Sequence, residues 1–364
     1  MKENLKICRR ENGIVQKLRK NKKNILSAVL FLLLAFLTFY AICKGNDMVK
    51  VVAAIRRMDI RYLIGAAVLG IFFVSAEGCM IWYLLRPLDD KTRFFKCIKY
   101  SFIGFFYSGI TPSATGGQPM QLYHMNKDGL RVSESTVVLM TVAVIYKFVL
   151  VVMGLLMLLL GYGQLREYLG KYLLLYYLGL FLNTALVVIL LIVIFRPGLF
   201  KSIVFRGEKF LVRLHILKHS TERLEKLAGF ADRYHATVQF YLKNKRKIAA
   251  VIGFTVIQRA SVFFLTYLVY LGFHLSGVSA LTVMMVQASV YIAVDMLPLP
   301  GAQGITELMY KAVFAGIFPG SFLTASMCVS RGINFYFLLI FAALLTMGCY
   351  ITDRLSKRRA VCAE

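Results

Sequence analysis

Two short stretches place helix-breaking and polar residues inside apolar sequence, which is where a buried binding site could form. The first, GITPSATGGQPMQ at residues 109–121, lies in a run without Asp, Glu, Lys or Arg at 100–125. The second, MLPLPGAQGITELMY at 296–310, repeats the order of proline, glycine-containing turn and helix restart. Helices that restart near Met120 and Ile305 would direct free N–H groups and positive dipole ends at one site. An anionic ligand would suit such a site.

Charged residues inside apolar helices are the second chemical signal. Each costs at least about 2.5 kcal/mol at the centre of a membrane helix, so we expect each to face the interior and a partner. The alternative for each is an ion pair that only holds helices together. We expect Lys147 and Arg331 to contact a lipid phosphate. Glu307 could cap the restarted helix, pair with a cation or repel unwanted anions. The sequence leaves the pairing open within the set Glu77, Lys147, Arg259, Asp295, Glu307 and Arg331.

The elements that carry these residues are predicted to be membrane helices. Of the 364 residues 59% are hydrophobic and 17% charged, and several charge-free runs approach the roughly 20 residues that cross a bilayer. The cysteines and histidines show no metal-ligand spacing and no catalytic motif, so we expect neither a metal site nor a cofactor. We expect full spans at about 25–43, 62–85, 135–160, 172–195, 248–271 and 332–352, and interrupted apolar zones at about 98–125 and 279–329.

The distribution of basic residues predicts which ends face the cytoplasm. Residues 196–247 contain thirteen Lys or Arg and four acids, and the basic N-terminus (1–24) and tail (353–364) should lie on the same side. When the membrane crossings between these basic segments are counted, the zone at 98–125 must enter and leave the membrane on the cytoplasmic side. The zone at 279–329 must cross an even number of times, either as two full spans or as a re-entrant hairpin from outside.

The predicted fold is therefore an all-α polytopic membrane protein with about six full spans and two broken, re-entrant hairpins in an inverted repeat. The membrane halves at 25–195 and 248–352 are joined by the amphipathic loop at 196–247, which we expect to lie on an anionic membrane surface. A net charge of +26 fits that surface better than nucleic acid. For either break alone, a kink that only shapes packing is the alternative, and the matched pair favours a site. Lys127, Asp128 and Arg131 are predicted to form a solvated turn.

Four segments together resemble the transmembrane, flippase-like region of lysyl-phosphatidylglycerol synthases, over about residues 20–355. They are GITPSATGGQPMQLYHM, AVIYKFVLVVMGLL, LPLPGAQGITELMYKAVF and SRGINFYFLLIFAAL. The resemblance implies a bacterial plasma-membrane protein that moves aminoacylated phosphatidylglycerol to the outer leaflet, which confers resistance to cationic antimicrobial peptides. Lys147 stands where the family usually has an arginine, which keeps the charge but loses the bidentate fork.

The resemblance and the residue analysis together give a candidate lipid-binding set. Besides the charged residues Lys147, Glu307 and Arg331, it comprises the loop residues Pro112, Thr115, Gly116, Gly117, Gln118, Pro300, Gly301 and Gly304. We assign Glu77, Arg259 and Asp295 as intramembrane charge partners, and no residue as catalytic.

Three functions remain open from the sequence. The first is a flippase-like protein for phosphatidylglycerol or lysyl-phosphatidylglycerol, whose partners are the membrane and an anionic or aminoacylated phospholipid. The second is a phosphatidylglycerol lysyltransferase, which would need a separate soluble synthase because no acyltransferase-like domain is visible. The third is a scaffold or small-solute transporter. A homo-oligomer stays open for each.

Overall fold

The computed structural model describes residues 48–90, 92–213 and 221–361, and the helix predicted at 25–43 lies outside them. The described residues are mostly helical and contain no strand, which confirms the all-α class. Five helical segments are long and apolar enough to cross a bilayer: Ile60–Leu85 (α3), Val132–Leu160 (α6), Tyr162–Phe195, Lys245–Gly272 (α11) and Phe322–Cys349. The third of these comprises α7 (Tyr162–Leu169), η2 (Gly170–Tyr172) and α8 (Leu173–Phe195).

Both interrupted zones form helix–turn–helix hairpins. The first comprises α4 (Phe94–Ile110), η1 (Pro112–Ala114) and α5 (Gly117–Lys127), and the second comprises α12 (Ala280–Val294), η3 (Pro300–Ala302) and α13 (Ile305–Val313). At 1.5 Å per residue, the 15-residue α12 is about 22 Å long, which is shorter than a hydrocarbon core of about 30 Å. The 9-residue α13 is shorter still. These lengths favour a re-entrant hairpin over two full spans.

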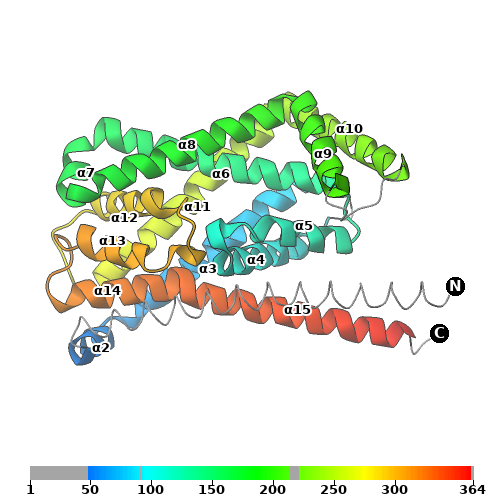
Figure 1. The fold of residues 1–364 in the computed structure, drawn as a ribbon. Coiled ribbons are helices and arrows are strands. Elements are labelled where there is room, and N and C mark those ends of the chain that lie inside the picture. The colour runs from blue at the N-terminus through cyan, green and yellow to red at the C-terminus, as the bar shows by residue number, and fades with distance from the viewer. Residues whose placement is uncertain (1–47, 91, 214–220, 362–364) are drawn as a thin grey trace.

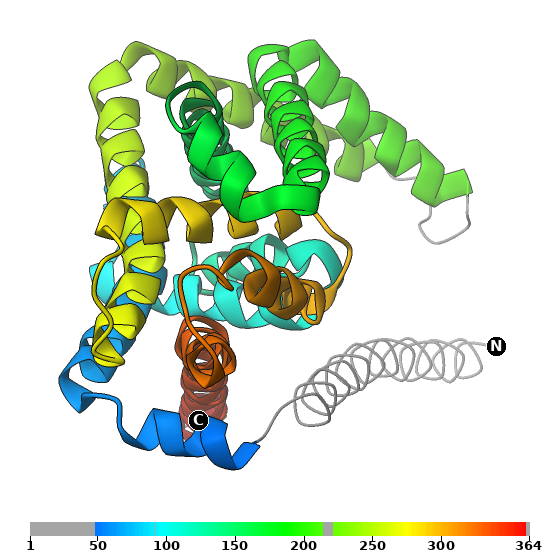
Figure 2. The same ribbon diagram turned by 90° about the vertical axis from the view of Figure 1, so that its left-hand side faces the viewer.

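The hairpins enter the bundle from opposite ends (Figure 1). The base of the α4–α5 hairpin lies toward the end that carries α9 (Pro197–Arg213), α10 (Thr221–Lys243) and the C-terminal end of α15. The base of the α12–α13 hairpin lies toward the other end, near α7 and α2 (Met48–Arg56). Figure 2, viewed along the bundle, shows both hairpins between the longer helices, with α3 and α11 to their left, α6 and α8 above them and α14 and α15 below. Of the predicted basic segments, the loop at 196–247 and the end of α15 therefore lie at the same end of the bundle, while the segment 1–24 lies outside the described residues.

The last long helix begins earlier than the apolar pattern predicts. It runs from α14 (Ser321–Arg331) through the π-helical turn η4 (Gly332–Phe337) into α15 (Leu338–Val361). Arg331 therefore lies inside a continuous helix and not at its start. Extra residues in a helical turn change which side chains face the neighbouring helices, and π-turns often occur at functional sites.

Close glycine contacts seat the first arm of each hairpin. A Cβ on Gly78 of α3 would lie 2.7 Å from the Cα of Ile98 in α4. A Cβ on Gly179 of α8 would lie 2.2 Å from the carbonyl oxygen of Ile292 in α12. Small residues let membrane helices approach backbone to backbone where no hydrophobic driving force between helices exists. Each hairpin is thus held against a long helix at a fixed depth.

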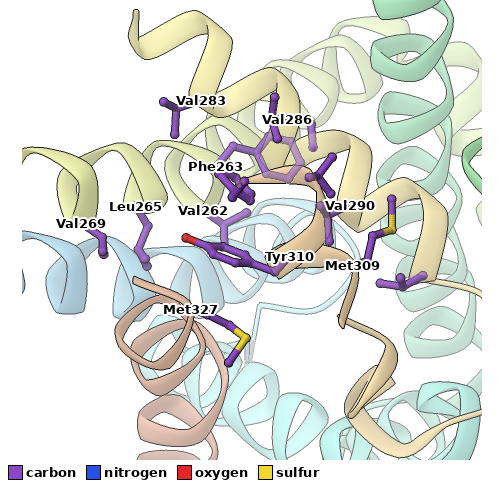
Figure 3. Packing of buried hydrophobic residues seen from close by; sticks show 14 of the residues in the cluster. Val262, Phe263, Leu265, Val269, Val283, Val286, Val290, Met309, Tyr310 and Met327 are labelled. Carbon is purple, nitrogen blue, oxygen red and sulfur yellow. The ribbon is translucent and has the colours of Figure 1, made fainter. Parts of the chain in front are cut away.

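The apolar core surrounds the second hairpin (Figure 3). Val283, Val286 and Val290 of α12 recur at helical spacing and are fully buried beside α11. On the other arm, the ring of Tyr310 stacks on Phe314 with centroids 4.2 Å apart. This packing makes α13 part of the core.

Candidate functional site

The two hairpin tips have the same local structure and touch each other. Each begins with an extended residue, Thr111 (φ −112°, ψ 144°) or Leu299 (φ −114°, ψ 136°), followed by proline at the first position of a short 3₁₀ turn. Proline disfavours helix in the residue before it and is tolerated where a helical turn starts. The local sequence therefore determines where each helix breaks. The turns η1 and η3 contact one another between the two halves of the bundle.

Hydroxyl groups satisfy the backbone of the first tip. The Oγ1 of Thr111 donates to the carbonyl of Tyr107 at 2.6 Å and accepts from the N–H of Gly116 at 2.9 Å. The Oγ1 of Thr115 donates to the carbonyl of Pro112 at 3.0 Å. Gly117 begins α5 in close contact with the hydroxyl of Ser108. Pro112, Thr115 and Gln118 of the predicted set are exposed, while Gly116 is half-buried and Gly117 is buried.

Charged groups satisfy the backbone of the second tip. The carboxylate of Glu307 accepts from the N–H of Gly304 at 2.8 Å and from the Nε of Arg331 at 2.9 Å. Arg331 also donates to the carbonyl of Gly301 at 3.0 Å. The side chains of Arg331 and Glu307 are only 11% and 6% exposed. Glu307 therefore both caps α13 and pairs with a cation, which the sequence analysis offered as alternatives.

Glycine at position 301 is required by conformation and by space. Its φ is +57°, and a Cβ there would lie 2.1 Å from the ring of Phe335 in η4. Gly304 also has a positive φ, +81°, and precedes the first residue of α13. Pro300, which begins η3, is buried. The amide of Gln303 is buried as well, and neither its nitrogen nor its oxygen has a hydrogen-bond partner among the described residues.

A second ion pair ties α6 to the start of the second tip. The Nζ of Lys147 pairs with the carboxylate of Asp295, the residue directly after α12, and also contacts the sulfur of Met296 at 3.5 Å. Both charged side chains are largely buried. Lys147, one of the two expected phosphate contacts, is therefore engaged by a carboxylate in this structure, as Arg331 is.

Glu77 pairs with an amide instead of a cation. The Nε2 of Gln121 in α5 donates to the Oε1 of Glu77 in α3 at 2.7 Å. The Gln121 side chain crosses directly over Gly104, where a Cβ would lie 2.2 Å from the amide nitrogen. Sequence reasoning missed Gln121, although its position four residues after Gly117 places it on the same face of the restarted helix.

Arg259 is surrounded by aromatic rings. Its side chain is fully buried on α11, and its guanidinium carbon lies 3.6 Å from the ring centroid of Tyr146, 4.8 Å from Phe73 and 5.6 Å from Tyr291. These rings come from α6, α3 and α12 and were not singled out in the sequence. In the sequence, the available indication of this cluster was that Tyr146 directly precedes Lys147, a charged residue inside an apolar helix.

At the base of the first hairpin, Asp128 binds a tyrosine hydroxyl and two lysines, and it is not part of a solvated turn. It accepts from the Tyr100 hydroxyl at 2.7 Å and from Lys99 at 3.1 Å, with Lys96 3.7 Å away. Burial acts to raise the pKa of Asp128, but these hydrogen bonds and the lysine charges outweigh it and lower that pKa. Arg131 differs, because its side chain is 63% exposed while bonded to Glu134. Among the described residues, no three His, Cys, Asp or Glu side chains gather closely enough to hold a metal ion.

The fold and these contacts define a multi-pass membrane protein in which two opposed broken hairpins meet beside buried ion pairs. The family model described as "Lysylphosphatidylglycerol synthase TM region" matches residues 24–342. The chain belongs to that family, as the sequence resemblance predicts. No curated protein matches the chain.

Proposed function

We propose that this protein moves phosphatidylglycerol or its lysyl ester from the inner to the outer leaflet of a bacterial plasma membrane. The family supports a membrane protein related to lysyl-phosphatidylglycerol handling, and transport is the proposed addition. The observation that carries it is the contact between the two hairpin tips, each of which interrupts a helix and is held by polar side-chain hydrogen bonds. Irregular backbone at membrane depth occurs where it is buried in protein or lines a polar path.

The two ion pairs offer groups that match the charges of the headgroup. A phosphate can replace the carboxylate partner of Lys147 or Arg331, and a lysyl ammonium can replace the cationic partner of Asp295 or Glu307. A headgroup carrying both charges can therefore open a pair without leaving a buried charge alone, which would be costly. The unpartnered amide of Gln303 adds a donor and an acceptor at the same tip.

The opposed entry of the hairpins suits transport between leaflets. One hairpin has its base toward the end that carries α9 and α10, and the other has its base toward the opposite end (Figure 1). We assign the α9–α10 end to the cytoplasm from its basic residues. If the two halves form an inverted repeat, one hairpin can move away from the helices around it while the other packs against them. Alternating between these two arrangements exposes the tips first to one side of the membrane and then to the other.

The test is a leaflet assay with purified protein in liposomes that contain fluorescent lysyl-phosphatidylglycerol, fluorescent phosphatidylglycerol or fluorescent diacylglycerol. We expect the protein to move at least one phospholipid, and E307Q and K147A to lower that rate at least tenfold. D59N is the matched control, because Asp59 only caps α3 by accepting from the N–H of Arg61 at 2.9 Å. Each variant must first elute as a monodisperse species.

Two results would contradict the proposal. One is no movement of either phospholipid by folded wild-type protein, which would favour a subunit that depends on a separate synthase. The other is a double variant E307Q/R331Q that transports at the wild-type rate, which would leave the Glu307–Arg331 pair a purely structural role.

A further inference from the structure

Arg259 is a buried cation whose hydrogen-bond donors have no acceptor. Its side chain is 0% exposed in the middle of α11, and none of its three guanidinium nitrogens has a partner among the described residues. The guanidinium stays charged under all ordinary conditions and carries five N–H donors. An arginine in this state inside a membrane protein is normally paired with an acceptor or lies on a substrate path.

The surrounding rings stabilise the charge without using the donors. Tyr146 lies over the guanidinium at 3.6 Å, a separation typical of stacked planes, and Phe73 and Tyr291 approach within cation–π distance. Aromatic faces attract the positive charge of the group, whereas its N–H bonds point outward in its own plane. The ring contacts therefore hold Arg259 in place and leave its planar fork able to bind an oxyanion.

The nearby carboxylates already have other partners. Glu77 interacts electrostatically with Arg259 but accepts its hydrogen bond from Gln121. Asp295 pairs with Lys147. Glu77 and Lys147 lie on α3 and α6, and Asp295 directly follows α12. The same three helices supply the aromatic rings around Arg259. The arrangement holds Arg259 close to negative charge and denies it a direct ion pair.

We propose that Arg259 is a buried binding point for a phosphate group, reached when the helices around it separate. A planar guanidinium matches two phosphate oxygens at once, and a fork held by stacking loses little freedom on binding. The lipid headgroup is the source of phosphate that we favour, and only that choice rests on the proposed function. Glu77 competes for the same guanidinium, so its charge opposes phosphate binding.

Binding can be measured in neutral detergent without any transport step. Phosphatidylglycerol, diacylglycerol and free glycerol phosphate are each titrated into the full-length protein, and the thermal midpoint and native mass spectra are recorded. We expect phosphatidylglycerol to bind the wild type and diacylglycerol not to. R259K should weaken that binding at least tenfold, and R259M should abolish it. R86M is the control, because Arg86 also lies over an aromatic ring, Trp82, but outside this cluster.

The direction in which E77Q changes phosphate binding decides between these roles of Glu77. Removing the competing negative charge should strengthen phosphate binding several-fold, whereas a purely structural role for the Glu77–Arg259 attraction predicts weaker binding or none. The proposal is overturned if R259K and E77Q both leave binding unchanged, or if E77Q weakens it as R259K does. R259K and E77Q each keep a polar side chain, so the test can still be made if R259M does not fold.

The remaining outcomes separate the source of phosphate from the site itself. Stabilisation by glycerol phosphate that needs Arg259, without stabilisation by the lipid, would support the site and overturn the lipid as its ligand. Arg259-dependent lipid binding in a protein that moves no lipid would reject the transport proposal and leave the binding point in place.

Discussion

The two broken hairpins share a local structure but differ in what stabilises their tips. The first tip is held by neutral hydroxyl hydrogen bonds, chiefly those of Thr111, and most of its turn is exposed. The second is more enclosed, with Pro300 and Gln303 buried, and is held by the Glu307–Arg331 pair and by Lys147 with Asp295. Neutral hydrogen bonds exchange readily with a polar ligand, whereas a buried ion pair opens only if both charges find new partners. We therefore expect the first tip to rearrange more easily.

Arg331→Met should have the largest effect on stability. It leaves the Glu307 carboxylate buried without its cation and removes the hydrogen bond to the carbonyl of Gly301. Breaking a buried pair on one side costs about 3–5 kcal/mol. Thermal unfolding followed by size-exclusion recovery should show a strong decrease in the midpoint.

The double variant E307Q/R331M tests the cause of that decrease. It should recover a substantial part of the lost stability, because no unpaired charge remains buried. A double variant as unstable as the single one would show that Arg331 acts through packing, for example on the Phe335 ring 4.6 Å from its guanidinium.

Gly301→Ala should have the next largest effect. The residue would have to keep a left-handed φ of +57°, and its new methyl carbon would press on the Phe335 ring. A cost of about 2–4 kcal/mol follows from left-handed backbone strain and overpacking. Adding F335L should relieve the overpacking and leave the strain, so the double variant should melt above the single one. If it melts lower still, the ring is not the group that the methyl displaces.

Thr111→Val should cost less, about 1–2 kcal/mol, because it removes two neutral hydrogen bonds and conserves side-chain shape. T115V is the matched control, since Thr115 is exposed and makes one bond to the carbonyl of Pro112. Equal melting midpoints for the two variants would contradict the role given to Thr111. In the leaflet assay, a T111V effect on rate larger than its effect on stability would support the first tip as the part that moves.

The sequence predicted the hairpins because local chemistry encodes them. Proline after an extended residue breaks each helix, and the restart at Ile305 was found at the correct residue. The restart of α5 at Gly117 lies three residues before the predicted Met120, because Gly116 and Gly117 allow the turn to close tightly on Thr111 and Ser108. Such contacts depend on side chains on the preceding arm.

The charge pairs could not be predicted, since they join residues far apart in the chain. Lys147 and Asp295 are 148 positions apart, and Gln121 and Glu77 are 44 apart. The late start predicted for the last helix has the same origin. Arg331 interrupts the apolar run, yet one helix continues through that position, where Arg331 pairs with Glu307. The aromatic rings around Arg259 meet from three helices, so no local pattern marks them.

The smallest expected effect lies at the base of the first hairpin, where Asp128 joins the end of α5 to the first turns of α4. Because its folded-state pKa lies below the ordinary 3.8, its contribution to stability is fully present above that value. It is lost as the pH falls through the folded-state pKa, because protonation removes the acceptor for Tyr100 and Lys99. D128N should lower the melting midpoint slightly at pH 7 and reduce the further decrease between about pH 5 and pH 3. Y100F should give an intermediate pH dependence, since the lysines remain. A pH dependence in D128N equal to that of the wild type would mean that the first hairpin is closed at its base by packing alone, and that the ionic contrast between the hairpins extends over their whole length.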